Sequence, residues 1–363
     1  MRSEVIQSLE VSAYKIPTDG PESDGTIQWD STTLVLVELE SEGVTGVGYS
    51  YAAPATAYYI EHALREIVMQ ADIMDIPATW QAMISAIRND GYCGIAAMAV
   101  AAIDNALWDL KAKVLGISLA SLLGMERTSI PVYGSGGFTS YTIEKLQNQL
   151  GGWVEKGIKQ VKMKIGREPE KDTERVKAAR EAIGDDVQLF VDANGAYNIK
   201  QAVEKAWQFD GYGVSWFEEP VSSDNLEGLS FIRREVPSGM KVAAGEYGYN
   251  PVYFERIVHA GAVDVLQADA TRCAVISGFL KAGNICDAHQ LLFSSHCAPS
   301  LHLPAALAVP SFYTAEYFYD HARIEDLLFD GSPQPVNGAL YPDLDKPGSG
   351  LTLKRKDAQR FRI

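Results

Sequence analysis

The sequence predicts an α/β protein in which a TIM-type barrel follows a smaller α+β unit. From about residue 128 onward, short apolar runs alternate with amphipathic helical stretches at intervals of roughly 20 to 30 residues. Eight such runs occur, which is the strand number of a TIM barrel, whereas a doubly wound sheet generally has fewer strands. The length of 363 residues suits a large barrel with a second unit.

The first unit, residues 1–127, is predicted to contain strands and then helices. Strands are expected at residues 5–14, 32–39 and 44–50, and helices at residues 57–69, 78–87 and 95–115. The second and third strands form a hairpin across Ser41, Glu42 and Gly43. Gly116 is the expected stop of the last helix.

The barrel is assigned to residues 128–323 and a C-terminal segment to residues 324–363. The eight apolar runs lie at residues 131–134, 160–165, 187–191, 214–217, 242–244, 263–267, 291–294 and 314–317. The last segment is rich in Gly, Pro and Asp, so it is expected to be irregular apart from one short strand at residues 351–353. We expect it to return to the first unit.

Composition excludes several classes of protein. A formal net charge of −15 opposes binding to nucleic acids and to anionic membranes. The four cysteines form no C-x-x-C pair, and residues 1–4 do not begin a signal peptide, so a cytoplasmic protein is expected. The most apolar stretch, residues 94–103, is too short to span a membrane. Neither a G-x-S-x-G elbow nor a glycine-rich phosphate loop is present.

Three carboxylates follow successive predicted strands, each about one β/α unit after the last. They are Asp192, Glu218 and Glu246. Active sites of such barrels lie at the carboxyl ends of the strands, so these side chains should converge there. An all-oxygen ligand set suits a hard cation that keeps water positions, which indicates Mg2+. Taken singly, each acid could instead cap a helix or pair with an arginine.

Two lysines precede this set. Lys162 and Lys164 lie on one face of their strand, because side chains alternate. Such a pair is usually solvated, but here it follows an apolar run. We expect two neighbouring ammonium groups near a dication to lower each other's pKa, which would allow a lysine to act as a base.

The last elements are an Asp–His pair and single residues near strand ends. Asp269 can orient His296 and stabilise its imidazolium, and we treat the other five histidines as structural. Glu316 is either a protonated donor to substrate or one partner of a buried ion pair. Arg272 and Tyr247 could bind substrate or pack against helices.

The ordered motifs resemble the enolase superfamily over essentially the whole chain. They are ALWDLKAK from Ala106, VKMKIG from Val161, VDANGAY from Val191, WFEEP from Trp216, AAGEY from Ala243, QAD from Gln267 and SSHC from Ser294. The resemblance implies a modified (β/α)7β barrel with an N-terminal capping domain. It also implies that Asp192, Glu218 and Glu246 bind Mg2+, with Glu218 rather than Glu219 as the ligand.

The K-x-K motif and the Asp269–His296 dyad resemble the mandelate-racemase type. Muconate-cycloisomerase and dipeptide-epimerase relatives carry a lysine at the end of the sixth strand, where this sequence has Asp269 to Arg272. One departure is Ala274-Val275, where many relatives have Gly-Gly.

The resemblance implies abstraction of the alpha proton of a hydroxy-carboxylate through an enediolate. Lys162 would contact the substrate carboxylate, and Lys164 and His296 would address opposite faces of the substrate. We favour dehydration of an acid sugar to a 2-keto-3-deoxy acid, since most relatives of this type are such dehydratases and the predicted capping loop, residues 18–26, is polar. A racemase, epimerase or lactone cycloisomerase could use the same residues, and a non-catalytic ligand-binding barrel is a remote alternative. We expect a homo-oligomer.

Overall fold

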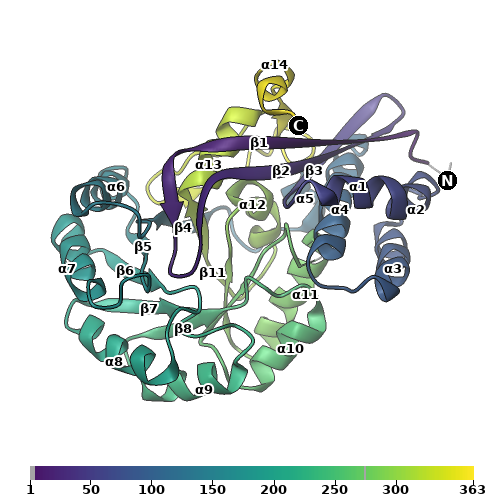
Figure 1. The fold of residues 1–363 in the computed structure, drawn as a ribbon. Helices are drawn as coiled ribbons and strands as arrows, with labels where there is room; N and C mark the ends of the chain where they lie inside the picture. Colours follow the sequence, from purple (N-terminus) through teal and green to yellow (C-terminus); the bar gives the residue numbers. More distant parts are fainter. Residues whose placement is uncertain (1–4, 274) are drawn as a thin grey trace.

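A three-stranded antiparallel sheet begins the computed structural model, which describes residues 5–273 and 275–363 (Figure 1). Its strands are β1 (Ser8–Ser23), β2 (Gln28–Ser41) and β3 (Val44–Tyr51), in that order. Glu42 and Gly43 both have positive φ, as a tight two-residue turn requires, so the predicted hairpin is present. Two expectations fall on residues outside the described ones. The absence of a signal peptide was inferred from residues 1–4, and the departure from the Gly-Gly of many relatives includes Ala274.

Helices follow the sheet, and α1, α2 and α4 pack against it. The helices are α1 (Ala55–Tyr59), a π-helical turn (Ile60–Leu64), α2 (Arg65–Met69), α3 (Ile76–Ala86), α4 (Ile95–Val114) and α5 (Leu119–Leu123). The long helix α4 lies so close to β3 that a Cβ atom on Gly48 would stand 2.2 Å from the Ala106 nitrogen. Glycine is therefore required there by close backbone approach. The sheet and helices form the predicted α+β cap.

Eight parallel strands then close into a barrel, because the last strand pairs with the first (Figure 1). They are β4 (Ile130–Gly136), β5 (Gln160–Lys164), β6 (Gln188–Asp192), β7 (Val214–Glu218), β8 (Lys241–Ala244), β9 (Val265–Ala268), β10 (Leu292–Ser295) and β11 (Phe312–Phe318). The predicted fold class is confirmed, and each predicted run overlaps one strand.

Helices surround the barrel on the outside (Figure 1). They are α6 (Ile143–Glu155), α7 (Asp172–Ile183), α8 (Ile199–Asp210), α9 (Leu226–Glu235), α10 (Pro251–His259), α11 (Val275–Ala288) and α12 (Pro299–Leu307). Inside the barrel, Tyr133, Phe190, Trp216, Ala243 and Val265 form a buried cluster. Side chains two residues further along β6 and β7 share this inward face, so the strands direct Asp192 and Glu218 towards the barrel mouth. None of the described helices is long and apolar enough to cross a membrane.

The C-terminal segment differs from the expectation at its start. Helix α13 (Tyr319–Leu328) continues past residue 324, where irregular chain was predicted, because Ile324 and Leu328 are fully buried on one side of it. Short elements follow: β12 (Phe329–Asp330), β13 (Ala339–Leu340), β14 (Thr352–Leu353) and α14 (Arg355–Ala358). The divisions after residues 127 and 323 stay predictions, and α13 runs through the second of them.

The end of the chain contacts the cap. The Ser349 amide donates to Asp109 of α4 at 2.6 Å, and Arg355 pairs with Glu38 of β2. Leu351 and Leu353 pack in one cluster with Tyr14 and Leu34 of the cap sheet.

The ends of β1 and β2 form a ribbon that reaches the barrel mouth beside β4 and β11 (Figure 1). The Thr139 amide donates to the Ser23 carbonyl at 2.9 Å, and the Tyr319 hydroxyl donates to Asp19. The predicted capping loop, residues 18–26, is thus the end of β1, of which Glu22 and Ser23 pair with β2, and the turn that follows.

Candidate active site

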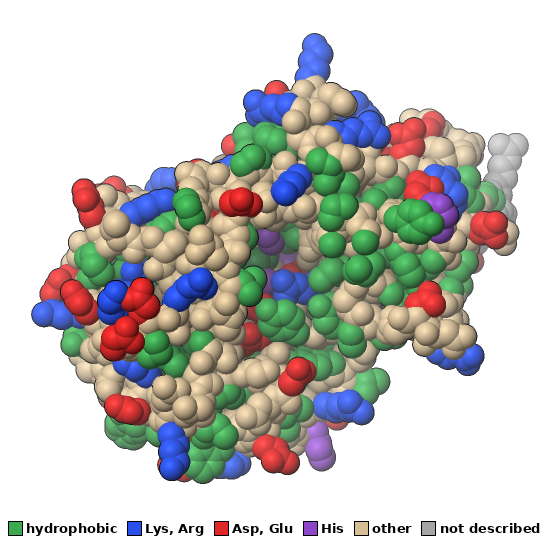
Figure 2. All heavy atoms as spheres, in the orientation of Figure 1, with side chains coloured by type: hydrophobic (Ala, Val, Ile, Leu, Met, Phe, Trp, Pro, Cys, Tyr) green, Lys and Arg blue, Asp and Glu red, His purple; other side chains and the backbone are tan. Residues whose placement is uncertain are grey.

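Charged side chains gather at the carboxyl ends of the barrel strands, beneath the cap. Figure 2 shows a hollow under the ribbon with acidic, basic and histidine side chains inside it. The strand register aligns Lys164 with Asp192 and Asp192 with Glu218 on three neighbouring strands. All three side chains are buried, so their charges interact at close range with little screening by water.

The three carboxylates proposed as metal ligands lie together. Asp192, Glu218 and Glu246 each offer an oxygen atom, and these atoms all lie within 4.8 Å of one another. Glu246 follows Gly245, whose φ of 136° and close approach to the Gln267 carbonyl exclude a side chain at that position. This backbone turn brings Glu246 into the group.

Two lysines neutralise part of this charge. Lys162 pairs with Glu218, with Glu316 at 2.9 Å and with Asp192 at 3.4 Å. Lys164 pairs with Asp192 at 2.5 Å. Each ammonium group is therefore surrounded by carboxylates and not by the other lysine.

The lowered lysine pKa values were expected beside a dication, and with the carboxylates alone around them the pKa values of both lysines are raised instead. Burial opposes the charge of Lys162, but Glu218 and Glu316 outweigh it and raise its pKa well above the usual value. For Lys164, burial and the charge of Lys162 lower the pKa, and the charge of Asp192 raises it with a net upward shift. Repulsion between the lysines exists, but attraction to the nearer carboxylates exceeds it.

His296 and Asp269 form the predicted dyad. His296 Nδ1 lies 2.8 Å from Asp269 Oδ2, while the Thr271 amide donates to Asp269 Oδ1 at 2.7 Å. Burial opposes ionisation of Asp269, but the hydrogen bond and charge of His296 lower its pKa below the usual range. An ionised Asp269 holds the proton on Nδ1, so His296 Nε2 faces the site.

Glu316 forms a buried ion pair, which is the second of the two roles considered for it. Its Oε1 lies 2.9 Å from Lys162 and accepts from Ser135 at 2.6 Å. Its Oε2 accepts from the Cys297 amide at 2.7 Å. Burial raises the pKa of Glu316, but the charges of Lys162 and His296 bring it well below the ordinary value. These contacts favour the ionised form of Glu316.

Comparison with known families identifies the family of this fold. A model for the mandelate racemase/muconate lactonizing enzyme N-terminal domain matches residues 15–124, and a model described as enolase C-terminal domain-like matches residues 145–358. The chain belongs to the enolase superfamily. Within it, the matched cap places the chain in the mandelate racemase/muconate lactonizing enzyme subgroup. It is therefore an enolase-superfamily enzyme.

Two characterised relatives of this enolase-superfamily enzyme catalyse different reactions. An arabinonate dehydratase of Saccharolobus solfataricus is 32% identical, with 88% of each chain covered. A 3,6-anhydro-alpha-L-galactonate cycloisomerase of Streptomyces coelicolor is 30% identical, with 96% of this chain and 97% of the relative covered.

Two solved structures share the complete architecture. A mandelate racemase/muconate lactonizing enzyme-like protein from Rubrobacter xylanophilus is 52% identical, with a TM-score of 0.97 over 99% of this chain and 100% of that one. A racemase from Streptomyces coelicolor A3(2), solved with bound magnesium, is 29% identical, with a TM-score of 0.93 over 99% and 100% of the two chains.

Several residues of this superfamily site were not singled out from the sequence. Trp216 Nε1 and Gln267 Nε2 each donate to Glu218 Oε2 at 3.0 Å, which fixes that carboxylate. His302 accepts from the Ala270 amide at 2.7 Å and contacts the Ala298 carbonyl at 2.9 Å, so it connects the loops after β9 and β10. Trp216 and Gln267 lie inside the WFEEP and QAD motifs, which was a usable signal, whereas nothing local distinguished His302.

A cavity of about 520 Å3 adjoins the dyad between cap and barrel. Its barrel side includes Asp269, Arg272 and His321, and its cap side includes Thr32 and Tyr51. Arg272 contacts Glu246 Oε1 at 3.3 Å and stands over the ring of Tyr247. Arg272 therefore borders both the carboxylates and the cavity, in agreement with a role in substrate binding, while half-exposed Tyr247 packs against it.

Proposed function

We propose that this enzyme uses Mg2+ to abstract the alpha proton of a hydroxy-carboxylate, and that its reaction is dehydration of an acid sugar to a 2-keto-3-deoxy acid. The observation that carries the proposal is the meeting of three carboxylates, Lys164 and the Asp269–His296 dyad in one buried site. The proton-transfer groups come from β5 and from the end of β10, which lie on different sides of the barrel.

Charge balance supports a divalent cation. Six buried carboxylates lie in or beside the site, namely Asp192, Glu218, Glu219, Glu246, Asp269 and Glu316. Three cationic groups, Lys162, Lys164 and Arg272, accompany them. The acids outnumber the bases. Burial and the charge of Asp192 raise the pKa of Glu218 well above its ordinary value, so a cation bound here would favour the ionised form of this carboxylate.

The ligand atoms fit the same ion. Glu246 Oε2 receives no well-aligned hydrogen bond from any described residue, although it is buried and lies 3.2 Å from His296 Nε2. Oxygen ligands from three strands suit Mg2+. Bound between Asp192, Glu218 and Glu246, it would supply positive charge against the negative charge that develops on the substrate carboxylate.

The residues of the chain divide the remaining work. Lys162, held by three acids, contributes a fixed positive charge at the base of the site. Lys164 Nζ is the proposed base on one face of the substrate, and it must first give up its proton and its contact with Asp192. His296 Nε2 exchanges a proton on the other face, with Asp269 fixing the ring.

Dehydration needs a leaving hydroxyl near an acid. His296, as the imidazolium, would protonate the C3 oxygen while the C–O bond breaks. The adjoining cavity offers hydroxyl, guanidinium and imidazole groups of Thr32, Tyr51, Arg272 and His321 to the hydroxyls of a sugar chain, and its remaining lining includes the apolar side chains of Ile95 and Met98. The arabinonate dehydratase relative supports this reaction. The cycloisomerase relative favours the second candidate, isomerisation or racemisation by the same residues.

A library of aldonic and aldaric acids, assayed with Mg2+, tests the proposal. We expect substrates with hydroxyls at C2 and C3 to yield 2-keto acids that semicarbazide traps with a new ultraviolet absorbance. If the products have inverted C2 centres or are ring-opened lactones, and no keto acid forms, the reaction is the second candidate, isomerisation or racemisation, and not dehydration. Bound Mg2+ without alpha-proton exchange for any acid would favour a non-catalytic barrel.

Isotope exchange in D2O tests the two faces. His296→Asn should keep alpha-proton exchange only for the configuration whose proton faces Lys164, and Lys164→Ala should keep it only for the other. His289→Asn, at an exposed position in the turn after α11, is the matched control. Equal loss for both configurations in each variant would contradict two opposed groups.

Two further expectations, about the cellular compartment and the oligomeric state, belong to the same proposal. The described cysteines are all free, which supports a reducing compartment such as the cytoplasm. A homo-oligomer stays a prediction, and light scattering coupled to size exclusion would test it.

A further inference from the structure

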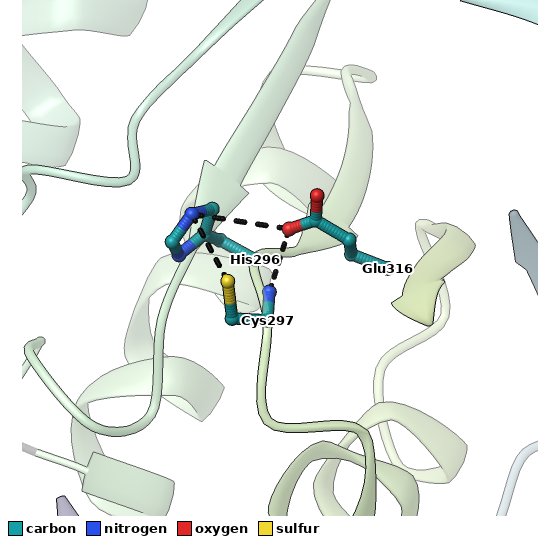
Figure 3. Close-up of side chains that lie close together, drawn as sticks. All are labelled: His296, Cys297 and Glu316. Atoms are coloured by element: carbon teal, nitrogen blue, oxygen red, sulfur yellow. Dashed lines mark hydrogen bonds and ion pairs between the residues drawn. The ribbon is translucent and has the colours of Figure 1, made fainter. Parts of the chain in front are cut away.

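A second group of potential metal ligands lies beside the carboxylates. His296 Nε2 is 3.3 Å from Cys297 Sγ and 3.8 Å from Glu316 Oε2 (Figure 3). The three ligand atoms all lie within 4.8 Å of one another, and the three residues are buried. Unlike Asp192, Glu218 and Glu246, this cluster offers a nitrogen and a sulfur atom.

The spacing agrees with a tetrahedral metal centre. Zn2+ binds His nitrogen and carboxylate oxygen at about 2.0–2.2 Å and Cys sulfur at about 2.3 Å, so ligand atoms around one ion stand roughly 3.4–3.6 Å apart. The measured separations of 3.3 and 3.8 Å lie within a few tenths of an ångström of these values. The third pair, Cys297 and Glu316, has its ligand atoms within 4.8 Å, so a shift of roughly an ångström or less would bring the three atoms around one cation.

The backbone holds the cluster in this form. Cys297 and Ala298 both adopt left-handed conformations, with φ of 55° and 37°, which are unfavourable for non-glycine residues. His302 contacts the carbonyls of both residues, at 3.0 and 2.9 Å, and supports this turn. The Cys297 amide in turn fixes Glu316 Oε2 at 2.7 Å.

The histidine is oriented as metal-binding histidines are. Asp269 takes the hydrogen on Nδ1, so the lone pair of neutral His296 lies on Nε2, towards Cys297 and Glu316. A carboxylate on the far nitrogen is the usual support of a zinc-bound imidazole. Nitrogen and thiolate ligands select Zn2+ or Cd2+ over Mg2+.

We propose that His296, Cys297 and Glu316 form a binding site for a thiophilic divalent cation of the Zn2+ type, and that its occupation blocks proton transfer at His296. The metal–nitrogen bond uses the Nε2 lone pair, and the Cys297 thiol releases its proton to water as the metal–sulfur bond forms. Binding follows from the cluster alone. Only the inhibitory effect rests on the proposed function.

Cd2+ titration of the Mg2+-loaded enzyme tests binding directly. In excess Mg2+, we expect one equivalent of Cd2+ to produce the ultraviolet charge-transfer absorbance of a cadmium–thiolate bond. Cys297→Ser and Cys297→Ala should both lose this absorbance, with circular dichroism verifying the fold. Cys93→Ser, which changes an exposed cysteine, should keep it. A wild-type enzyme without the band, or a folded Cys297 variant that retains it, would overturn the site.

Inhibition is a separate measurement on any substrate that the library provides. With Mg2+ in excess, removing one of three ligands should raise the Zn2+ concentration for half-inhibition at least about tenfold in Cys297→Ser, relative to the Mg2+-only activity of the same variant. Equal inhibition of wild type and variant would show that Zn2+ acts at the carboxylates instead and would overturn the inhibitory role. The cadmium band needs no activity, so its result is independent of the proposed reaction.

Discussion

A buried carboxyl group in the cap ribbon gives a quantitative test of the electrostatics. Glu22 is fully buried near the end of β1. Its Oε2 accepts from Trp29 Nε1 at 2.9 Å, whereas its Oε1 has no hydrogen-bond partner among the described residues. Burial, together with the charges of Asp320 and Asp19, raises the pKa of Glu22 to about 8, against the opposing effects of Trp29 and Arg323.

The replacement Glu22→Gln keeps the size of the side chain and removes its titration. Folded Glu22 binds a proton up to about pH 8, whereas the unfolded side chain releases it near pH 4.5, so the wild type loses stability as pH rises between these values. Each pH unit inside this window corresponds to at most about 1.4 kcal/mol. Between pH 6 and 8, the free energy of unfolding of the wild type should fall by about 2 kcal/mol relative to Glu22→Gln.

Urea denaturation at several pH values, followed by circular dichroism, measures this difference. The variant should become progressively the more stable protein as pH rises, and the difference should level off above pH 8. Glu42→Gln, at an exposed position in the hairpin turn, is the control and should leave the pH dependence unchanged. A constant difference between wild type and Glu22→Gln from pH 5 to 9 would refute the argument that Glu22 is protonated in the folded state.

Three further predictions follow from single contacts. EDTA should abolish activity and Mg2+ should restore it. The replacement Glu246→Gln should weaken Mg2+ binding at least about tenfold, as measured by calorimetry. Full activity of the metal-free enzyme would contradict the metal assignment. Gly48→Ala should destabilise the protein by about 1–3 kcal/mol, because its Cβ would overlap the Ala106 backbone, whereas Gly152→Ala on open helix α6 should be neutral or stabilising in the same denaturation assay. His302→Ala should cost about 1–3 kcal/mol through the unpaired Ala270 amide, and an unchanged melting temperature would exclude that support.

The barrel could be predicted because its strands are buried on both faces. Residues 187–191 and 214–217 are largely apolar, each with one polar residue, Gln188 or Ser215, and the structure forms β6 and β7 there. Strand β1 was predicted too short. The chain from Pro17 to Ser23 is polar and contains two prolines, so its strand character depends on pairing with β2, which local sequence does not encode.

Helix α13 was missed for a related reason. Its apolar positions Ile324 and Leu328 have helical spacing, but the following Gly- and Pro-rich chain dominated the prediction for the whole segment. Tertiary burial of these two side chains decides the local structure.

Some features of the candidate site could be predicted from the sequence and others could not. Convergence of Asp192, Glu218 and Glu246 could be predicted because each follows a strand, and strand ends share one rim. The pKa values of Lys162 and Lys164 could not be predicted, because they depend on which charges lie nearest in space. Glu316 lies over 150 residues away in the chain and yet contacts Lys162.

The two ligand clusters adjoin each other at His296, which belongs to one cluster and contacts Glu246 of the other, and this has a consequence for how metal controls the enzyme. Its Nε2 lies 3.2 Å from Glu246 Oε2 and 3.3 Å from Cys297 Sγ. An ion held by oxygen atoms leaves the imidazole free for proton exchange, whereas an ion held by nitrogen and sulfur occupies it. Mg2+ and Zn2+ should therefore bind to different ligand atoms and have opposite effects on activity. Because they do not compete for one site, added Mg2+ should reverse Zn2+ inhibition only weakly. Strong competition between the two ions would instead mean that both bind the carboxylates.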